Sequence, residues 1–228
     1  QMCIRDRIDE DTDIIAYSRE QVELLDNYFR DTNAETAYLL GRWCGLRINE
    51  CYGLKWDNID LRRGTITIDR QMQYQEGLIK LVSLKTRNAR RTVYMSAKLK
   101  EYLRHLKQEN KVQSVALAEQ RAQNQTFITD IDGQQISSLE LVNCLPNGKI
   151  QTVNSMKYHS RTIKSELGIN FKYHHLRHTY GTRLAEMNTP THILCNQMGH
   201  ASGKVTERYY LAVSKPGIDV LTKNLNAM

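Results

Sequence analysis

Several features that mark secreted, zinc-stabilised or membrane proteins are missing from this sequence. The five cysteines are an odd number and form no CxxC pair, which argues against a disulfide framework and against a zinc knuckle. No apolar run approaches the roughly eighteen residues of a membrane span, and no signal-peptide hydrophobic segment follows the first residues. Repeats and low-complexity segments are also absent. We therefore expect a cytoplasmic protein with free thiols and no membrane attachment.

The charge balance favours an anionic partner. The chain has 32 Lys and Arg against 25 Asp and Glu, a formal net charge of +7, and its pI is about 9.1. An excess of this sign makes nucleic acid the leading candidate without establishing it. With 40% hydrophobic residues, the 228-residue chain can build one domain of good size or two small ones.

Hydrophobic periodicity predicts helices over most of the chain. Ser18, followed by Gln21, forms a capping-box pattern that starts a helix to about Arg30. A second helix, residues 34–44, is ended by Gly45, which is suited to a left-handed cap. Further helices are predicted for residues 49–54, 96–110 with a weaker continuation at 111–123, 152–167, 174–186, 190–198 and 203–213.

Alternating apolar residues between Ile59 and Met95 predict strands at 65–68, 78–84 and 91–94. We expect these to form one antiparallel sheet of about three strands, too small to be stable without helices against it. Another short strand is predicted at 126–129. The expected fold class is α+β, a mostly helical domain with a small three-stranded antiparallel sheet.

The segment from Lys172 to Tyr180 contains three histidines and an arginine within five positions, 174–178. If Leu176 marks the buried side of a helix, His174 and Arg177 lie three residues apart on neighbouring faces. They then present a titratable donor and a fixed cation to one oxyanion. Taken alone, this HxxR pattern also fits a basic helix with its charges in water.

Five short motifs in order change that interpretation. They are GLRINE at 45–50, LKT at 84–86, HHLRHT at 174–179, MGH at 198–200 and TERY at 206–209. In this order and spacing the chain resembles the catalytic domain of the tyrosine recombinases, the phage integrase family, over roughly residues 18–213. The resemblance implies the DNA breaking-rejoining fold of that family. It also implies three segments: an N-terminal remnant or linker (1–17), the catalytic domain (18–213) and a C-terminal tail (214–228).

Arginines suit the phosphodiester that this resemblance implies as substrate. Cleavage without a metal needs cations at the non-bridging phosphate oxygens, and guanidinium groups bind such oxygens with fixed geometry and stay charged. Arg47 and Arg177 are the candidates. By resemblance, His174 and His200 occupy the family's first and second histidine positions, and His200 adds a hydrogen bond to the phosphate.

The resemblance selects Tyr209 as the nucleophile. A phenol with a pKa near 10 needs a proton acceptor and nearby cations, and His174 is the implied acceptor. On one continuous helix, nine positions are about 900° of rotation and would put His200 and Tyr209 on opposite faces, so a break at 201–203 must bring them together. Tyr210, the competing nucleophile, lies about 100° away around the helix.

The loop before residue 91 carries the remaining expected roles. Lys85 is the implied general acid that protonates the leaving 5′ oxygen. Arg87, Arg90 and Arg91 are expected to contact DNA phosphates, which positions DNA without reading its sequence. Glu50 is expected to orient the segment that holds Arg47.

The implied product is a 3′-phosphotyrosyl bond, which stores the energy for rejoining and needs neither a nucleotide cofactor nor a metal. The expected partner is double-stranded DNA, with four protomers on two duplexes and accessory DNA-bending or directionality factors. Relatives usually carry an N-terminal DNA-clamping domain, so this chain is expected to be a fragment or a minimal form.

Three alternatives remain open from the sequence. A type IB topoisomerase or a hairpin-forming resolvase would show the same motifs, and only the DNA product separates them. A DNA-binding protein without catalysis is a second alternative. A metal site is a third, because His174 and His178 form an i, i+4 pair, although no acidic residue or third ligand accompanies them.

Overall fold

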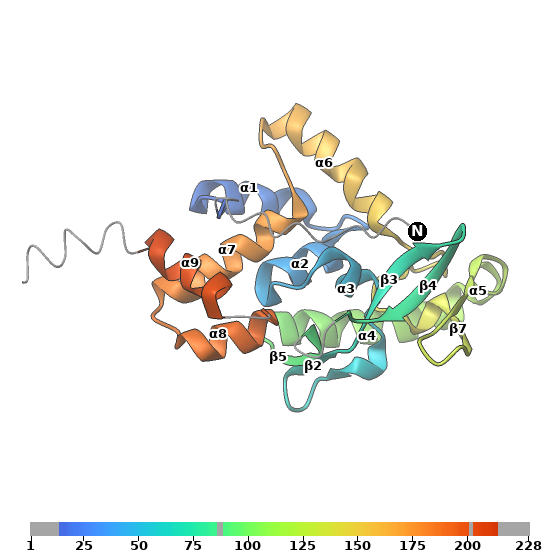
Figure 1. Ribbon diagram of the computed structural model, residues 1–228. Coiled ribbons are helices and arrows are strands. Elements are labelled where there is room, and N and C mark those ends of the chain that lie inside the picture. The colour runs from blue at the N-terminus through green and yellow to red at the C-terminus, as the bar shows by residue number, and fades with distance from the viewer. Residues whose placement is uncertain (1–13, 86–88, 201–202, 214–228) are drawn as a thin grey trace, which may run out of the picture.

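A computed structural model describes residues 14–85, 89–200 and 203–213, and helices make up most of it (Figure 1). The predicted tail at 214–228, most of the predicted linker at 1–17 and Arg87 lie outside the described residues. The helices are α1 (Arg19–Phe29), α2 (Glu35–Cys44), α3 (Ile48–Tyr52), α4 (Ala97–Ala116), α5 (Ala118–Asn124), α6 (Val153–Leu167), α7 (Tyr173–Glu186), α8 (Thr191–Met198) and α9 (Gly203–Val213), with short 3₁₀ turns at Trp56–Asn58 and Ser138–Glu140.

The local signals for helix ends are confirmed. The Ser18 side chain accepts from the backbone N–H of Gln21, and the Gln21 side chain accepts from the Ser18 N–H, which is the predicted capping box. Gly45 and Gly199 adopt the left-handed conformation after α2 and α8, with φ of 63° and 64°. These ends are specified locally, because cap hydrogen bonds and positive φ depend on neighbouring residues.

The strands form two sheets. They are β1 (Ile59–Asp60), β2 (Thr65–Ile68), β3 (Arg70–Gln75), β4 (Leu78–Ser83), β5 (Arg91–Tyr94), β6 (Phe127–Thr129) and β7 (Gln135–Ser137). One sheet has the order β1-β2-β5 and is antiparallel throughout. The other has the order β3-β4-β6-β7, with a parallel contact between β4 and β6.

The α+β fold class is therefore confirmed, but the predicted membership of the three-stranded sheet is wrong. Strand 78–83 belongs to the second sheet, where it pairs with β3, and β1 takes its place in the first. The reason is that the apolar side chains are buried in two different places. Ile66 and Val93 are buried as a pair in the first sheet, and Met72 and Leu81 are buried as a pair in the second. Period-two alternation shows which residues are buried but not which strands pair.

Helix α2 lies at the centre of the fold and contacts α7 (Figure 1). The contact is close because Gly41 has no side chain: a Cβ there would lie 2.6 Å from the Tyr173 hydroxyl oxygen. That hydroxyl donates a 2.9 Å hydrogen bond to the carbonyl of Ala37. The N-terminal turn of α7, which carries the HxxR motif, is thereby fixed on α2.

A second, smaller apolar cluster joins the last three helices. Ala185 of α7, Leu194 and Met198 of α8 and Tyr209 of α9 are buried together. Helix α8 also contacts β5 of the first sheet. The C-terminal helices are thus packed against both α7 and the sheet, and α7 is packed on α2, which brings the motifs at 45–50, 174–179, 198–200 and 206–209 toward one region.

Candidate active site

Arg177 is the largest fully buried side chain of the described residues, with 2% of the residue exposed. One guanidinium nitrogen donates to the carbonyl of Gly45 at 2.6 Å and another donates to the carbonyl of Met198. Within the described part of the chain these carbonyls are its hydrogen-bond partners, and no carboxylate forms an ion pair with it. Burial lowers the pKa of Arg177 to about 9, and Arg47 and Arg91 act in the same direction. It remains charged at neutral pH without a direct counter-ion.

Arg47 caps the N-terminus of α3 and has a side chain that is 40% exposed. Its guanidinium donates to Glu50 Oε1 at 2.9 Å, and its backbone N–H donates to Glu50 Oε2 at 2.9 Å. Glu50 thus orients Arg47, as expected from the sequence. Arg47 keeps donors that face solvent, whereas Arg177 lies beneath the surface.

Arg91, the third arginine predicted to contact DNA, is buried. Its side chain is only 4% exposed and holds Glu50 through two hydrogen bonds, of 3.0 Å to Oε1 and 2.8 Å to Oε2. It also donates to the carbonyls of Gln197 and Ala89, both at 3.1 Å. Glu50 and these carbonyls occupy the guanidinium, which argues against the predicted phosphate contact for Arg91. The sequence did contain a signal for this burial. Arg91 lies two positions before the buried Val93 in β5, so both side chains point to the same face of the strand.

The carboxylate of Glu50 is 1% exposed and accepts from two arginines. Burial alone raises the pKa of Glu50, but the hydrogen bonds and charges of Arg91 and Arg47 outweigh burial and bring the pKa to about 2. One carboxylate therefore faces two guanidinium groups, and the group of three has a net positive charge.

The histidines of α7 meet on one side of that helix. The rings of His174 and His178 are 4.6 Å apart at 77°, and His178 Nδ1 accepts from the backbone N–H of Ile15 at 3.3 Å. Burial lowers the pKa of each of these two histidines to about 4, and for His174 the charges of His178, Arg177 and Arg47 contribute further. His174 is thus a neutral imidazole: neighbouring groups partly desolvate its ring, while the residue as a whole remains open to solvent.

His200 and Tyr209 are brought together as predicted, with parallel rings 6.0 Å apart and 10° between their planes. His200 Nδ1 forms a 2.8 Å hydrogen bond with the Thr206 hydroxyl, which fixes the ring. Burial lowers the pKa of His200 to about 3, with Arg177 and Arg47 adding to the shift. The predicted break at 201–203 falls largely on residues 201–202, outside the described ones.

Tyr209 is 3% exposed, and its ring lies on the backbone of Gly181, where a Cβ would be 2.7 Å from the ring. Burial raises the pKa of the Tyr209 phenol, and the charges of Arg177 and Arg47 oppose that shift. Tyr210, in contrast, donates its hydroxyl to the carbonyl of Thr189. The surroundings of the two tyrosines thus differ: arginine charges act on the Tyr209 phenol, whereas the Tyr210 hydroxyl is bonded to the backbone.

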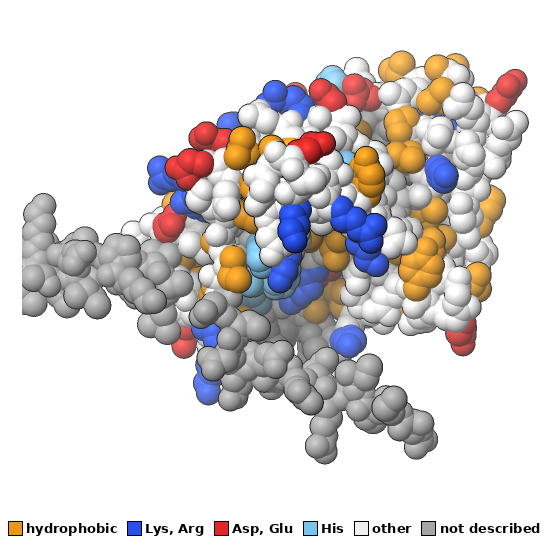
Figure 2. Space-filling view, turned by 90° about the horizontal axis from the view of Figure 1, so that it is seen from above, with side chains coloured by type: hydrophobic (Ala, Val, Ile, Leu, Met, Phe, Trp, Pro, Cys, Tyr) orange, Lys and Arg blue, Asp and Glu red, His pale blue; other side chains and the backbone are white. Residues whose placement is uncertain are grey.

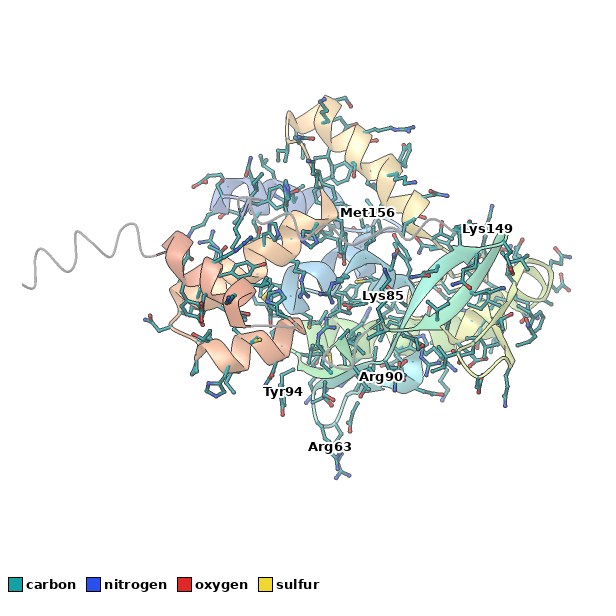
Figure 3. All side chains as sticks on the ribbon, viewed as in Figure 1. Arg63, Lys85, Arg90, Tyr94, Lys149 and Met156 are labelled. Carbon is teal, nitrogen blue, oxygen red and sulfur yellow. The ribbon has the colours of Figure 1, made fainter. Side chains whose placement is uncertain are left out.

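The basic loop contributes two exposed side chains, Lys85 after β4 and Arg90 before β5, both labelled in Figure 3. In the same view Tyr94 marks the other end of β5, beside α8, and Arg63 points away from the helices. Lys85 and Arg90 are thus accessible to a ligand. Their predicted roles remain predictions.

Seen as a surface, the histidines gather beside Lys and Arg side chains around a hollow on one face (Figure 2). The charges of Arg47 and Arg177 act on His174 and His200, and neutral imidazoles can donate or accept protons. A buried cation that pairs with no carboxylate among the described residues, such as Arg177, is suited to bind an anion.

The remaining expectations concern metals and membranes. The described residues contain no group of three or more His, Cys, Asp or Glu side chains placed to hold a metal ion. In the same part of the chain, no helix combines the length and the apolar character needed to cross a bilayer.

Comparison with known proteins identifies the family of the chain. The model of the phage integrase family matches residues 16–215. The tyrosine recombinase XerC-like protein of Caldanaerobacter subterraneus subsp. tengcongensis is 25% identical over 217 residues, covering 89% of this chain and 51% of that protein. The chain therefore spans about half the length of this curated relative.

Two solved structures share the fold. The Tn1549 transposon integrase in complex with transposon right end DNA superposes with a TM-score of 0.70 at 17% identity, over 94% of this chain and 67% of that one. XerA recombinase superposes with a TM-score of 0.57 at 18% identity, over 88% and 61%. At these identities the likeness shows a common architecture.

Proposed function

Because this chain belongs to the phage integrase family, we propose that it is a site-specific DNA recombinase that cleaves and rejoins strands through a 3′-phosphotyrosyl intermediate. The observation that best supports this is Arg177, a buried cation without a carboxylate partner among the described residues, close enough to Tyr209 to act on its pKa. A phosphodiester supplies the missing negative charge at that place.

In the proposed cleavage step, Arg47 and Arg177 bind the non-bridging oxygens of the scissile phosphate. The Tyr209 oxygen attacks phosphorus, the new bond joins tyrosine to the 3′ phosphate, and the bond from phosphorus to the 5′ oxygen breaks. His200 donates a hydrogen bond to the phosphate through Nε2, since Thr206 occupies its Nδ1. The cations offset the charge that develops on the phosphate in the transition state.

Two proton transfers complete the step. His174 accepts the phenol proton, which its neutral ring permits. Lys85 gives a proton to the leaving 5′ oxygen, which departs as a hydroxyl. Religation reverses both transfers when another 5′ hydroxyl attacks the phosphotyrosine, so no external energy source is needed.

The proposed substrate is double-stranded DNA. Four protomers would act on two duplexes, with accessory DNA-bending or directionality factors setting the direction of exchange. Arg87 and Arg90 are proposed to hold the DNA backbone. The proposed location is the cytoplasm.

A suicide-substrate experiment with DNA of randomised sequence tests the proposal for any recognition site. The protein is incubated with a library of nicked random duplexes, and covalent protein–DNA adducts are isolated after denaturation. We expect adducts enriched in one sequence, joined through the 3′ phosphate to Tyr209 and formed in excess chelator. Failure of the wild-type protein to form any adduct would contradict the proposal. Incubation of the enriched site as a supercoiled plasmid and as paired duplexes then separates relaxation from strand exchange.

A further inference from the structure

Arg91 is the buried arginine of the site that the proposed mechanism does not use. It begins β5, and its guanidinium reaches both α3, through Glu50, and the C-terminal end of α8, through the carbonyl of Gln197. Four of its five N–H donors are engaged when the bond to the Ala89 carbonyl is included. A lysine has neither the number nor the planar arrangement of donors to reproduce this.

The end of α8 lies directly on the Arg91 side chain. A Cβ at Gly199 would be 2.7 Å from Arg91 Cδ, so α8 ends against this arginine. The residue before Gly199 is Met198, whose carbonyl holds Arg177, and the residue after it is His200. Arg91 therefore contacts the backbone segment that bonds Arg177 and leads into His200, two of the residues proposed to bind the phosphate.

The charges give Arg91 a second effect. Without it, Glu50 and Arg47 would form a neutral ion pair, and a phosphate would have to compete with Glu50 for the Arg47 guanidinium. With Arg91 present, the three side chains sum to +1, and the buried Glu50–Arg91 pair is neutral by itself. The side chain of Arg47 is 40% exposed and that of Arg91 is 4% exposed, so the accessible cation is the one left uncompensated.

We propose that Arg91 is a positioning residue of the recombinase site: it neutralises Glu50, so that the charge of Arg47 is available to the phosphate, and it ties α3 to the end of α8, so that Arg47, Arg177 and His200 keep a fixed separation. This inference rests on the proposed function for its catalytic consequence, but its electrostatic part concerns anion binding alone.

Sulfate binding by the DNA-free full chain tests the electrostatic part. The measurement is the rise in melting temperature with sulfate relative to chloride at equal ionic strength. Arg91→Met lowers the local charge from +1 to 0, so we expect it to lose most of the sulfate shift. The double variant Arg91→Met with Glu50→Gln returns the local charge to +1 and should recover the sulfate shift. A wild-type sulfate shift in Arg91→Met would overturn this part.

Single-turnover cleavage at saturating DNA tests the tether. Misplacement of a reacting group by about 1 Å costs on the order of 100-fold in rate, and we expect a loss of this size in Arg91→Met. The double variant should recover sulfate binding but not the full rate, because the link to Gln197 is still missing. Arg91→Lys keeps the charge and is the variant of choice if Arg91→Met does not fold.

The control is Arg63→Met, an arginine with a 78% exposed side chain on the turn after β1, pointing away from the helices (Figure 3). We expect Arg91→Lys, which keeps the charge, to lose rate with an unchanged dissociation constant for DNA, and Arg91→Met to lose more in rate than in DNA affinity. A wild-type cleavage rate in Arg91→Lys would overturn the tether. So would an effect confined to DNA affinity and its salt dependence, which would make Arg91 a DNA contact.

If wild-type protein forms no adduct, the proposed function fails while the sulfate series still decides the electrostatic part.

Discussion

Arg177 donates a 2.6 Å hydrogen bond to the carbonyl oxygen of Gly45, a residue 132 positions earlier that ends α2 in the left-handed conformation. The same guanidinium reaches the carbonyl of Met198, just before Gly199 ends α8. C-terminal carbonyls of helices carry partial negative charge and lack partners within the helix. Within the described residues, two helix ends thus hold a buried cation through carbonyl dipoles and without an ion pair, which leaves its charge available to an anion.

Substitution of Gly45 should be costly. Gly45→Ala forces a Cβ onto a residue with φ of 63° and places it 2.6 Å from the Tyr180 ring. We expect a loss of unfolding free energy of about 1–2 kcal/mol for the conformation and about 1–3 kcal/mol for overpacking. The control is Gly168→Ala, with φ of 66° and nothing within 4 Å of the added Cβ, which should lose the first part only. Urea denaturation measures the unfolding free energy of both variants. Equal losses in Gly45→Ala and Gly168→Ala would contradict a cost from overpacking at Gly45.

Tyr209→Phe should abolish the covalent adduct on a nicked suicide duplex while leaving DNA binding intact, because it removes the attacking oxygen and keeps the ring on Gly181. Tyr210→Phe is the matched variant. Its hydroxyl is bonded to the Thr189 carbonyl, so we expect a stability loss of about 1 kcal/mol with the adduct retained. An adduct in Tyr209→Phe that disappears in Tyr210→Phe would reverse the assignment.

Lysine substitutions should distinguish the two arginines that are proposed to bind the phosphate. We expect both Arg47→Lys and Arg177→Lys to slow single-turnover cleavage by at least about 100-fold, the usual cost of losing one transition-state donor. Only Arg177→Lys should also be markedly less stable, since it loses a charged hydrogen bond to a buried carbonyl, about 1.5–3 kcal/mol. Stability and rate measured on the same preparations check this, and equal stability of the two variants would argue against it.

The lowered pKa values of the histidines predict that the folded protein loses stability in acid. In the folded chain the pKa values of His174 and His178 are about 4 and that of His200 is about 3, against about 6.5 in the unfolded chain. Below pH 6.5 the unfolded chain therefore binds more protons at these residues, so unfolding free energy falls as the pH drops through the window from about 6.5 to 3. His178→Gln should flatten the slope. Urea midpoints at pH 7, 6 and 5 test this, and a constant stability over that range would disprove it.

DNA binding should weaken steeply with salt, because Lys and Arg contacts release counter-ions from DNA. We expect log K to fall linearly with log salt, and Arg90→Gln to reduce the slope by about 1 if Arg90 contacts one phosphate. Fluorescence anisotropy between low and moderate salt measures the slope. A flat response of the wild-type protein would argue against a DNA partner.

The sequence by itself determined the helices and their ends. The Ser18 capping box and the glycine cap at Gly45 depend on residues close in the chain, and their hydrogen bonds and positive φ follow from side chains within a few positions. The order of the five motifs also identified the family and selected the candidate site residues. Motifs report which side chains a site needs, but not which of them are free to act.

Tertiary structure decided the pairing of strands and the role of each arginine. Ile66 and Met72 follow the same alternating pattern, yet they belong to different sheets because their partners are chosen by long-range burial. Arg90 and Arg91 are adjacent and chemically identical, yet one is exposed and the other is enclosed by Glu50 and the end of α8. The energetic cost of burying a charge depends on which groups surround it, and segments distant in the chain supply those groups.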